Sequence, residues 1–214
     1  MVDRNDMPHL IDGPEEASIV VALAHGAGQP MDSPFMAFFA HRLATAGCRV
    51  IRFEFPYMAE RRSTGIRRPP DRPDVLTATW KAIIGEMDPS HLVIGGKSLG
   101  GRMATMVADE AAVSAVVCLG YPFHPPGDAV RTRIDHLATL RTPTLVVQGT
   151  RDPFGNRDEV AGYPLSPMIR FHWLAGCDHG FVRRDGRGRT QHEPWQDALT
   201  AVVGFTRALA TKAD

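Results

Sequence analysis

The chain has 214 residues, of which 43% are hydrophobic and 22% are charged, and its formal net charge at pH 7 is zero. A chain of this length and composition can bury one sizeable core, so we expect residues 1–214 to form a single domain. A neutral chain has no overall attraction for nucleic acid or an anionic membrane, and we expect neither as a partner.

The amino-terminal segment and the cysteines favour a cytoplasmic protein. The first eight residues are polar and lack the basic start and apolar stretch of a secretory signal, and no apolar run approaches membrane-spanning length. Three cysteines, Cys48, Cys118 and Cys177, lie in or beside apolar segments, which is typical of reduced and buried thiols. We therefore predict a cytoplasmic location.

Short β-branched runs alternate along the chain with segments of helical period, which is typical of a parallel sheet with helices on both faces. The expected strands are a weak edge strand near Leu10, then Ser18–Ala24, Arg49–Phe55, His91–Ile94, Val113–Leu119, Thr144–Gln148 and Met168–Leu174. The expected helices are Pro34–Ala46, Pro73–Met87, Leu99–Ala108, Arg131–Leu140 and Pro194–Lys212. Residues 56–73 are rich in Pro, Gly and charge and are expected to form a loop. The pattern predicts an α/β fold with a doubly wound, mostly parallel sheet of about six or seven strands.

The segment 92–101 joins an expected strand to an expected helix through Gly96-Lys97-Ser98-Leu99-Gly100. A serine on such a sharp turn occupies strained backbone, and the flanking glycines leave room around it, so its hydroxyl is exposed above the sheet edge. Ser98 is therefore a candidate nucleophile, the alternative being a simple turn residue. A phosphate-binding loop is excluded because the glycine that it requires would fall at His91, within a strand.

A serine hydroxyl needs a general base and a group that orients the base. Asp152 and His179 each follow an expected strand, and carboxyl ends of parallel strands share one sheet edge. We predict His179 as the base and Asp152 as its partner, with Asp178 and Glu54 as the rival acids.

Two main-chain N–H groups are candidates for an oxyanion hole, which stabilises the charge on a tetrahedral intermediate. They belong to Leu99, which follows the serine, and to Ala27 in the glycine-rich stretch after the first strong strand. His25 in the same stretch is expected to hydrogen-bond the backbone there rather than to act as a second base.

Several further side chains are expected near this edge of the sheet. Four aromatic residues follow strand ends and are candidates for lining an apolar pocket, or for core packing: Tyr57, Tyr121, Phe123 and Phe154. Five arginines in the expected loop could form a cationic rim for an anionic substrate, although a solvated loop is favoured: Arg61, Arg62, Arg67, Arg68 and Arg72. No metal or other cofactor is expected, because the spacing of Cys177, His172, His179 and His192 is unlike that of a zinc site.

The order Ser98, Asp152, His179 is that of α/β-hydrolases. The chain resembles this superfamily through Leu23-Ala24-His25-Gly26-Ala27-Gly28, Gly95-Gly96-Lys97-Ser98-Leu99-Gly100-Gly101-Arg102, Gly120-Tyr121-Pro122-Phe123 and Gln148-Gly149-Thr150-Arg151-Asp152-Pro153. It is similar to the branch that includes testis-expressed and chromatin-complex proteins and small bacterial members, and that is related to dienelactone hydrolases. The chain departs from dienelactone hydrolases proper in carrying serine where they carry cysteine. The resemblance implies a minimal hydrolase without a large lid.

The sequence therefore predicts a serine hydrolase of small carboxylic esters or thioesters that works through an acyl-enzyme. The alternative is a protein that keeps the hydrolase fold for binding or as a scaffold, with little or no turnover. The expected partner is a small-molecule ester, and a homodimer is a further possibility.

Overall fold

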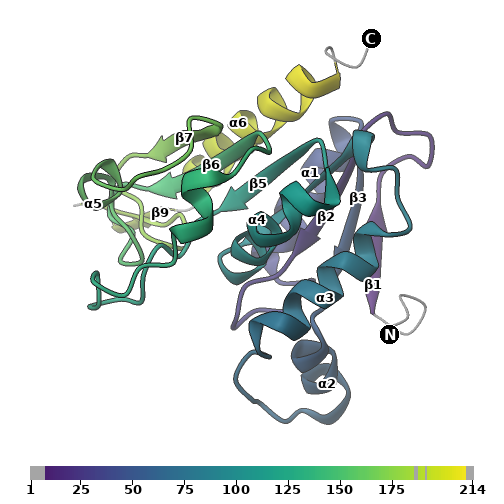
Figure 1. Ribbon diagram of the computed structural model, residues 1–214, viewed down its shortest axis with the longest axis horizontal. Coiled ribbons are helices and arrows are strands. Elements are labelled where there is room, and N and C mark those ends of the chain that lie inside the picture. The colour runs from purple at the N-terminus through teal and green to yellow at the C-terminus, as the bar shows by residue number, and fades with distance from the viewer. Residues whose placement is uncertain (1–7, 186–187, 191, 211–214) are drawn as a thin grey trace.

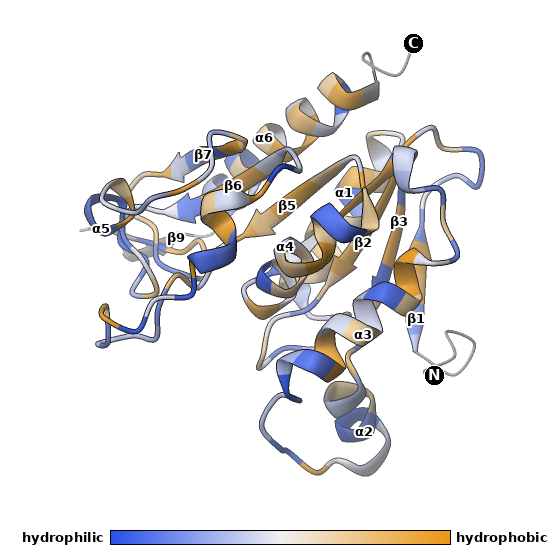
Figure 2. Cartoon of the chain, in the orientation of Figure 1, coloured by the Kyte–Doolittle hydropathy of each residue, from blue (hydrophilic) through white to orange (hydrophobic). Residues whose placement is uncertain are grey.

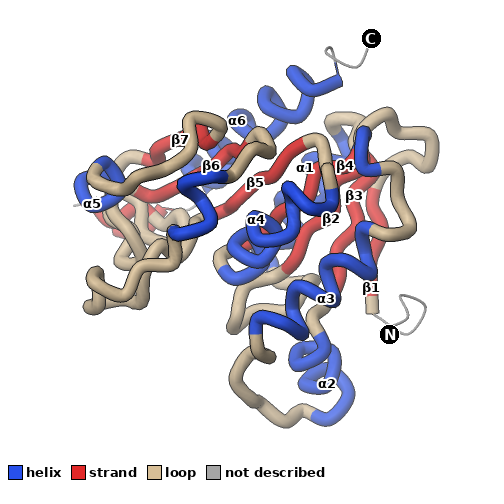
Figure 3. The backbone as a smooth tube through the Cα atoms, in the orientation of Figure 1, coloured by secondary structure: helices blue, strands red, loops and turns tan. Residues whose placement is uncertain are grey.

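Seven strands form one sheet in the order β1-β3-β2-β4-β5-β6-β7 in the computed structural model, which describes residues 8–185, 188–190 and 192–210 (Figures 1 and 3). Their bounds are β1 His9–Asp12, β2 Val20–Ala24, β3 Arg49–Phe53, β4 Leu92–Lys97, β5 Ala115–Leu119, β6 Thr144–Gly149 and β7 Ile169–Leu174. β1 pairs antiparallel with β3, and the other neighbours pair parallel. The predicted fold class is confirmed, including the edge strand near Leu10.

Helices cover both faces of the sheet, as the pattern of the sequence predicts. α3 (Pro73–Ile84) and α4 (Leu99–Ala111) pack on one face, and α1 (Pro34–Thr45) and α6 (His192–Ala210) pack on the other (Figure 1). Trp80 of α3 and Phe39 of α1 are fully buried, one in each layer. β5 and β6 are buried along their whole length, which explains why β5 is wholly apolar (Figure 2) and why the centre of β6, residues 145–147, is apolar. In the part of the chain that is described, no helix has both the length and the apolar character to cross a membrane.

The prediction of a loop over residues 56–73 is wrong for its first half, where α2 spans Pro56–Thr64. Pro56 occupies the first helical position, which its fixed φ favours, and Gly65 ends the helix with a φ of 74°. Asp71 caps α2 from the loop that follows, since its carboxylate accepts the N–H of Tyr57 at 2.9 Å. The helix was not predicted because the segment is rich in charged residues and because Asp71, which caps the start of the helix, lies beyond its end in sequence.

The prediction of an α-helix over Arg131–Leu140 is also wrong, because only a 3-10 helix, η3, forms over Asp135–Thr139. Ile134, Leu137 and Leu140 are buried, and their spacing of three residues fits three residues per turn. The connection from β5 to β6 therefore lacks an α-helix.

Three short elements complete the fold, none of them predicted from the sequence: α5 (Arg157–Ala161), and a hairpin of β8 (Arg183–Asp185) and β9 (Gly188–Thr190). α3 ends at Ile84, before the predicted Met87, with Gly85 as its C-cap, and η2 (Pro89–His91) then precedes β4. Residues 211 and 212 of the predicted last helix lie outside the described residues.

Candidate active site

The turn between β4 and α4 places Ser98 at the carboxyl edge of the sheet in strained backbone. Its φ is 49° and its ψ is −108°, and its N–H donates to the carbonyl of Leu119 at 3.2 Å. The turn is pressed against the end of β2: a Cβ on Gly96 would lie 1.9 Å from the Ala24 oxygen, and a Cβ on Gly100 would lie 2.3 Å from it. Only glycine fits these two positions, so the geometry expected of a nucleophile turn is present.

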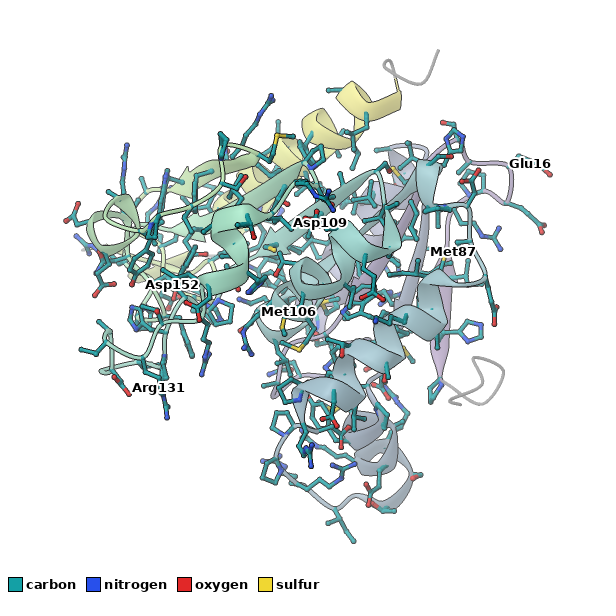
Figure 4. The ribbon with its side chains drawn as sticks, viewed as in Figure 1. Glu16, Met87, Met106, Asp109, Arg131 and Asp152 are labelled. Carbon is teal, nitrogen blue, oxygen red and sulfur yellow. The ribbon has the colours of Figure 1, made fainter. Side chains whose placement is uncertain are left out.

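The side chains of Asp152 and His179 meet at the same edge. His179 Nδ1 donates to Asp152 Oδ2 at 2.7 Å, and Asp152 is fully buried. The carboxylate is held by two further donors, Gln148 Nε2 at 2.9 Å and the N–H of Phe154 at 2.8 Å. Figure 4 shows Asp152 beyond the end of β6, among side chains from several loops. Because Nδ1 carries the shared proton, Nε2 of the imidazole is left as the proton acceptor.

A direct backbone contact brings the loops of Asp152 and His179 together. A Cβ on Gly149, the last residue of β6, would lie 2.3 Å from the carbonyl oxygen of Cys177 and 2.7 Å from that of Asp178. The same Cys177 carbonyl accepts the N–H of Arg151 at 3.0 Å. The acid and the imidazole are therefore positioned by packed main chain on both sides.

The imidazole of His179 is set up as a neutral base. Its Nε2 is buried and has no hydrogen-bond partner among the described residues. Burial lowers the pKa of His179, the charge of Lys97 lowers it further, and the hydrogen bond to Asp152 opposes both. The ring of Phe154 lies 4.3 Å from the imidazole between centroids, which shields the pair from one side.

Both rival acids have other structural roles. Asp178 Oδ1 accepts the N–H groups of Gly180 at 2.9 Å and Val182 at 3.1 Å, and so fixes its own loop. Glu54 is fully buried and forms a two-pronged ion pair with Arg62, at 2.6 and 2.9 Å. Asp152 is the carboxylate that bonds the imidazole.

Residues 25–28, which we call the oxyanion loop, are held by two buried side chains. His25 Nε2 accepts the N–H of Phe55 at 3.1 Å, so its Nδ1 is the protonated nitrogen and donates to Gly26 O at 2.7 Å. Burial lowers the pKa of His25, which favours this neutral form. Tyr57 Oη donates to the carbonyls of Ala27 at 3.1 Å and Gly26 at 3.4 Å. His25 thus bonds the backbone, as the sequence analysis expected.

These contacts orient Ala27, and the start of α4 orients Leu99, the other candidate oxyanion donor. In a trans peptide the C=O and N–H groups point in opposite directions, so the N–H of Ala27 points away from the side on which Gly26 O is bound. Leu99 begins α4, and N–H groups in the first turn of a helix have no acceptor within the helix. Both N–H groups therefore belong to well-held backbone. Neither donates to an acceptor within a helix, so both are candidates to bind a substrate oxygen.

Three of the four candidate pocket aromatics are core residues. Tyr57, Tyr121 and Phe123 are at most 1% exposed, and Tyr121 Oη donates to Arg133 O at 2.9 Å. They are too far inside to line an open pocket, and Phe154 alone of the four borders His179 while half-buried.

A different pocket, with a volume of about 350 Å³, borders the site. Its lining includes Gly26, Phe35, Lys97, Gly180 and Trp195. Phe35 and Trp195 come from α1 and α6, and their rings lie 5.1 Å apart between centroids. The sequence did not indicate this pair, because the two helices are adjacent only in the folded chain.

The arginines considered as a cationic rim are largely neutralised by carboxylates. Arg62 pairs with Asp32 as well as with Glu54, and Arg68 and Arg72 also form ion pairs. Arg61 donates to the carbonyl of Gly28 at 3.3 Å. Four of the five arginines therefore have partners within the protein, which argues against a free cationic rim.

Within the described ranges, no group of three or more His, Cys, Asp or Glu side chains could hold a metal ion. His172 bonds Asp197 at 2.9 Å, away from the imidazole of His179. Cys48, Cys118 and Cys177 are free and buried.

Solved structures with the same fold include several hydrolases. An α/β serine hydrolase without lid from Xanthomonas campestris is 17% identical over 96% of this chain and 88% of its own, with a TM-score of 0.66. A dienelactone hydrolase from Anabaena variabilis is 22% identical over 96% and 91% of the two chains, with a TM-score of 0.67. A monoacylglycerol lipase from Paleococcus ferrophilus is 16% identical over 95% and 99%, with a TM-score of 0.70.

These likenesses establish the fold that the sequence motifs predicted. The family model described as "Alpha/beta hydrolase domain" matches residues 17–207, from just before β2 to the last turns of α6. The match includes the Ser98 turn, the Asp152 loop and the His179 loop. The chain therefore belongs to the α/β-hydrolase domain family.

Proposed function

We propose that the protein is a serine hydrolase that cleaves small carboxylic esters or thioesters through an acyl-enzyme. The observation that carries this proposal is the Asp152–His179 hydrogen bond of 2.7 Å, at the sheet edge where Ser98 occupies its strained turn. A buried carboxylate, an imidazole with a vacant Nε2 and an adjacent serine turn are the parts of a nucleophilic relay.

The reaction follows from the chemistry of these groups. Ser98 Oγ attacks the substrate carbonyl while His179 Nε2 accepts the hydroxyl proton, and the N–H groups of Ala27 and Leu99 stabilise the oxyanion. The intermediate collapses, the carbon–oxygen or carbon–sulfur bond breaks, and His179 returns the proton to the leaving alcohol or thiol. Water then attacks the acyl-enzyme with the same base, which releases the acid and regenerates the serine.

The pocket lined by Phe35 and Trp195 supports a small substrate. Three of its lining residues are sequence neighbours of the proposed machinery: Gly26 precedes Ala27, Lys97 precedes Ser98, and Gly180 follows His179. A volume of about 350 Å³ lies near the lower end of the range of ligand pockets. We therefore expect short acyl or small aromatic groups to be preferred to long chains.

A fluorophosphonate probe tests the nucleophile directly. The wild-type protein should be labelled and Ser98→Ala should not be, whereas Ser90→Ala should be labelled like wild type because Ser90 lies in η2, before the start of β4. A panel of p-nitrophenyl esters of increasing acyl length then tests the pocket, with acetate or butyrate expected to be the fastest. Absence of labelling in wild type and both variants would favour the binding or scaffold alternative, and equal rates from acetate to palmitate would contradict a small pocket.

The proposed partner is thus a small-molecule ester. The cytoplasmic location, the lack of a nucleic acid or membrane partner and the possible homodimer remain predictions from composition and sequence.

A further inference from the structure

Lys97 is a charged residue of the site that the proposed reaction does not use. It is the last residue of β4 and directly precedes Ser98. Its Nζ donates to the main-chain oxygen of His179 at 2.5 Å, across 82 positions of sequence. The side chain therefore connects the nucleophile turn to the loop that carries the imidazole.

The ammonium is enclosed by rings and glycines. It lies 5.5 Å from the centroid of the Phe35 ring and 5.3 Å from that of Phe181, and the described residues provide it with no ion pair. A Cβ on Gly120 would lie 2.7 Å from Nζ and 3.3 Å from His179 Nδ1, so ammonium and imidazole flank the same glycine. Gly120 has a φ of 76° and must be glycine for two reasons, the backbone conformation and this crowding.

Three charged groups act on the imidazole of His179. Asp152 bonds Nδ1, Asp178 lies in the same loop and faces the N–H groups that follow it, and Lys97 approaches from β4. Burial lowers the pKa of Lys97 to about 8, against the opposing effect of the two carboxylates, so the ammonium form predominates at pH 7. A cation beside a base disfavours protonation of that base.

We propose that Lys97 is a positioning residue that fixes the His179 loop through its main-chain carbonyl and, through its charge, keeps the imidazole free to accept the serine proton in mildly acidic solution. The inference rests on the proposed function for its catalytic meaning. The hydrogen bond fixes the position of the imidazole, and the charge lowers the pH at which the imidazole becomes protonated. These two effects predict different responses to substitution.

The charge effect is tested by NMR titration of the His179 imidazole, which needs no turnover. The His179→Gln variant identifies the resonance among the nine histidines. Lys97→Met and Lys97→Gln both remove the charge, and unit charges on the order of 6 Å apart near a protein surface interact enough to change a pKa by up to about two units. We expect both variants to raise the pKa of His179 by about that amount. Lys81→Met, a matched control that removes an exposed lysine paired with Glu110, should leave it unchanged.

The positioning effect is tested by kinetics on p-nitrophenyl acetate. Because the base must be unprotonated, the acidic limb of kcat/KM should move to higher pH in both Lys97 variants by the same amount as the pKa of His179, up to about two units. Lys97→Gln retains an N–H donor and Lys97→Met does not. At high pH we therefore expect kcat of Lys97→Met to be about tenfold lower than kcat of Lys97→Gln, with KM little changed.

An unchanged His179 pKa in both Lys97 variants would overturn the charge effect, and equal kcat in the two would overturn the anchoring of the loop. If the wild type hydrolyses no ester and resists the fluorophosphonate while the Lys97 variants still shift the titration, the proposed function fails and the electrostatic inference stands.

Discussion

Gly149→Ala is the substitution that most directly tests how the Asp152 and His179 loops are joined. The added Cβ would lie 2.3 Å from the Cys177 oxygen, whereas nonbonded carbon and oxygen atoms need at least about 3.0 Å. The His179 loop must therefore retreat by roughly 0.7 to 1 Å, and a misplacement of about 1 Å can lower a rate by on the order of 100-fold. The shift also weakens the bond from Arg151 N–H to the same carbonyl.

The assay is kcat/KM on p-nitrophenyl acetate, with fluorophosphonate labelling and circular dichroism on the same samples. We expect kcat/KM to fall about 100-fold while the protein stays folded, at a cost of roughly 1 to 3 kcal/mol in the free energy of unfolding. The matched control is Gly204→Ala in α6, where a Cβ meets nothing within 4 Å and alanine should add up to about 1 kcal/mol of stability. If Gly149→Ala folds and keeps activity within twofold of wild type, the contact of Gly149 with Cys177 does not position the His179 loop.

Three further substitutions or conditions probe other parts of the site. Tyr57→Phe should lower kcat about tenfold and the free energy of unfolding by about 1 kcal/mol, because the oxyanion loop loses a buried donor; unchanged kcat in steady-state assays would contradict this role. Arg62→Gln should cost about 2 kcal/mol in urea denaturation, since it leaves the buried Glu54 carboxylate without its cation, while activity on neutral esters stays within about twofold. His25 and His136 have pKa values below 6.5 in the folded protein, so the unfolded chain binds more protons just below that pH. The free energy of unfolding should therefore fall as the pH drops from 7 to 5, by up to about 1.4 kcal/mol per unit for each histidine, and a rise over this range would show the sign to be wrong.

Local sequence was sufficient for the features that depend on neighbouring residues. The turn at Ser98 could be predicted because a strained φ and two close backbone contacts leave glycine as the only residue that fits on either side. The strands could be predicted because strands that are buried on both faces are rich in apolar residues. His179 and Asp152 could be proposed because parallel strands bring their carboxyl ends to one edge.

The tertiary structure decided which groups pair. The sequence favoured Asp152 over Asp178 and Glu54 as the partner of His179, and the packing of Gly149 against Cys177 supplies the contact that holds the two loops together. Tyr57 resembled a pocket residue, yet its hydroxyl holds the oxyanion loop. α2 was missed because its cap, Asp71, lies beyond the helix.

The sequence by itself determined the fold class, the strained turn at Ser98 and the order of the candidate catalytic residues, because strand burial and backbone strain constrain residue type locally. The structure alone decided the pocket between α1 and α6 and the position of Lys97. These depend on contacts between residues far apart in the chain, such as the 82 positions that separate Lys97 from His179. Such contacts leave no periodic or compositional signal in a single sequence, because each is fixed only when the sheet edge assembles.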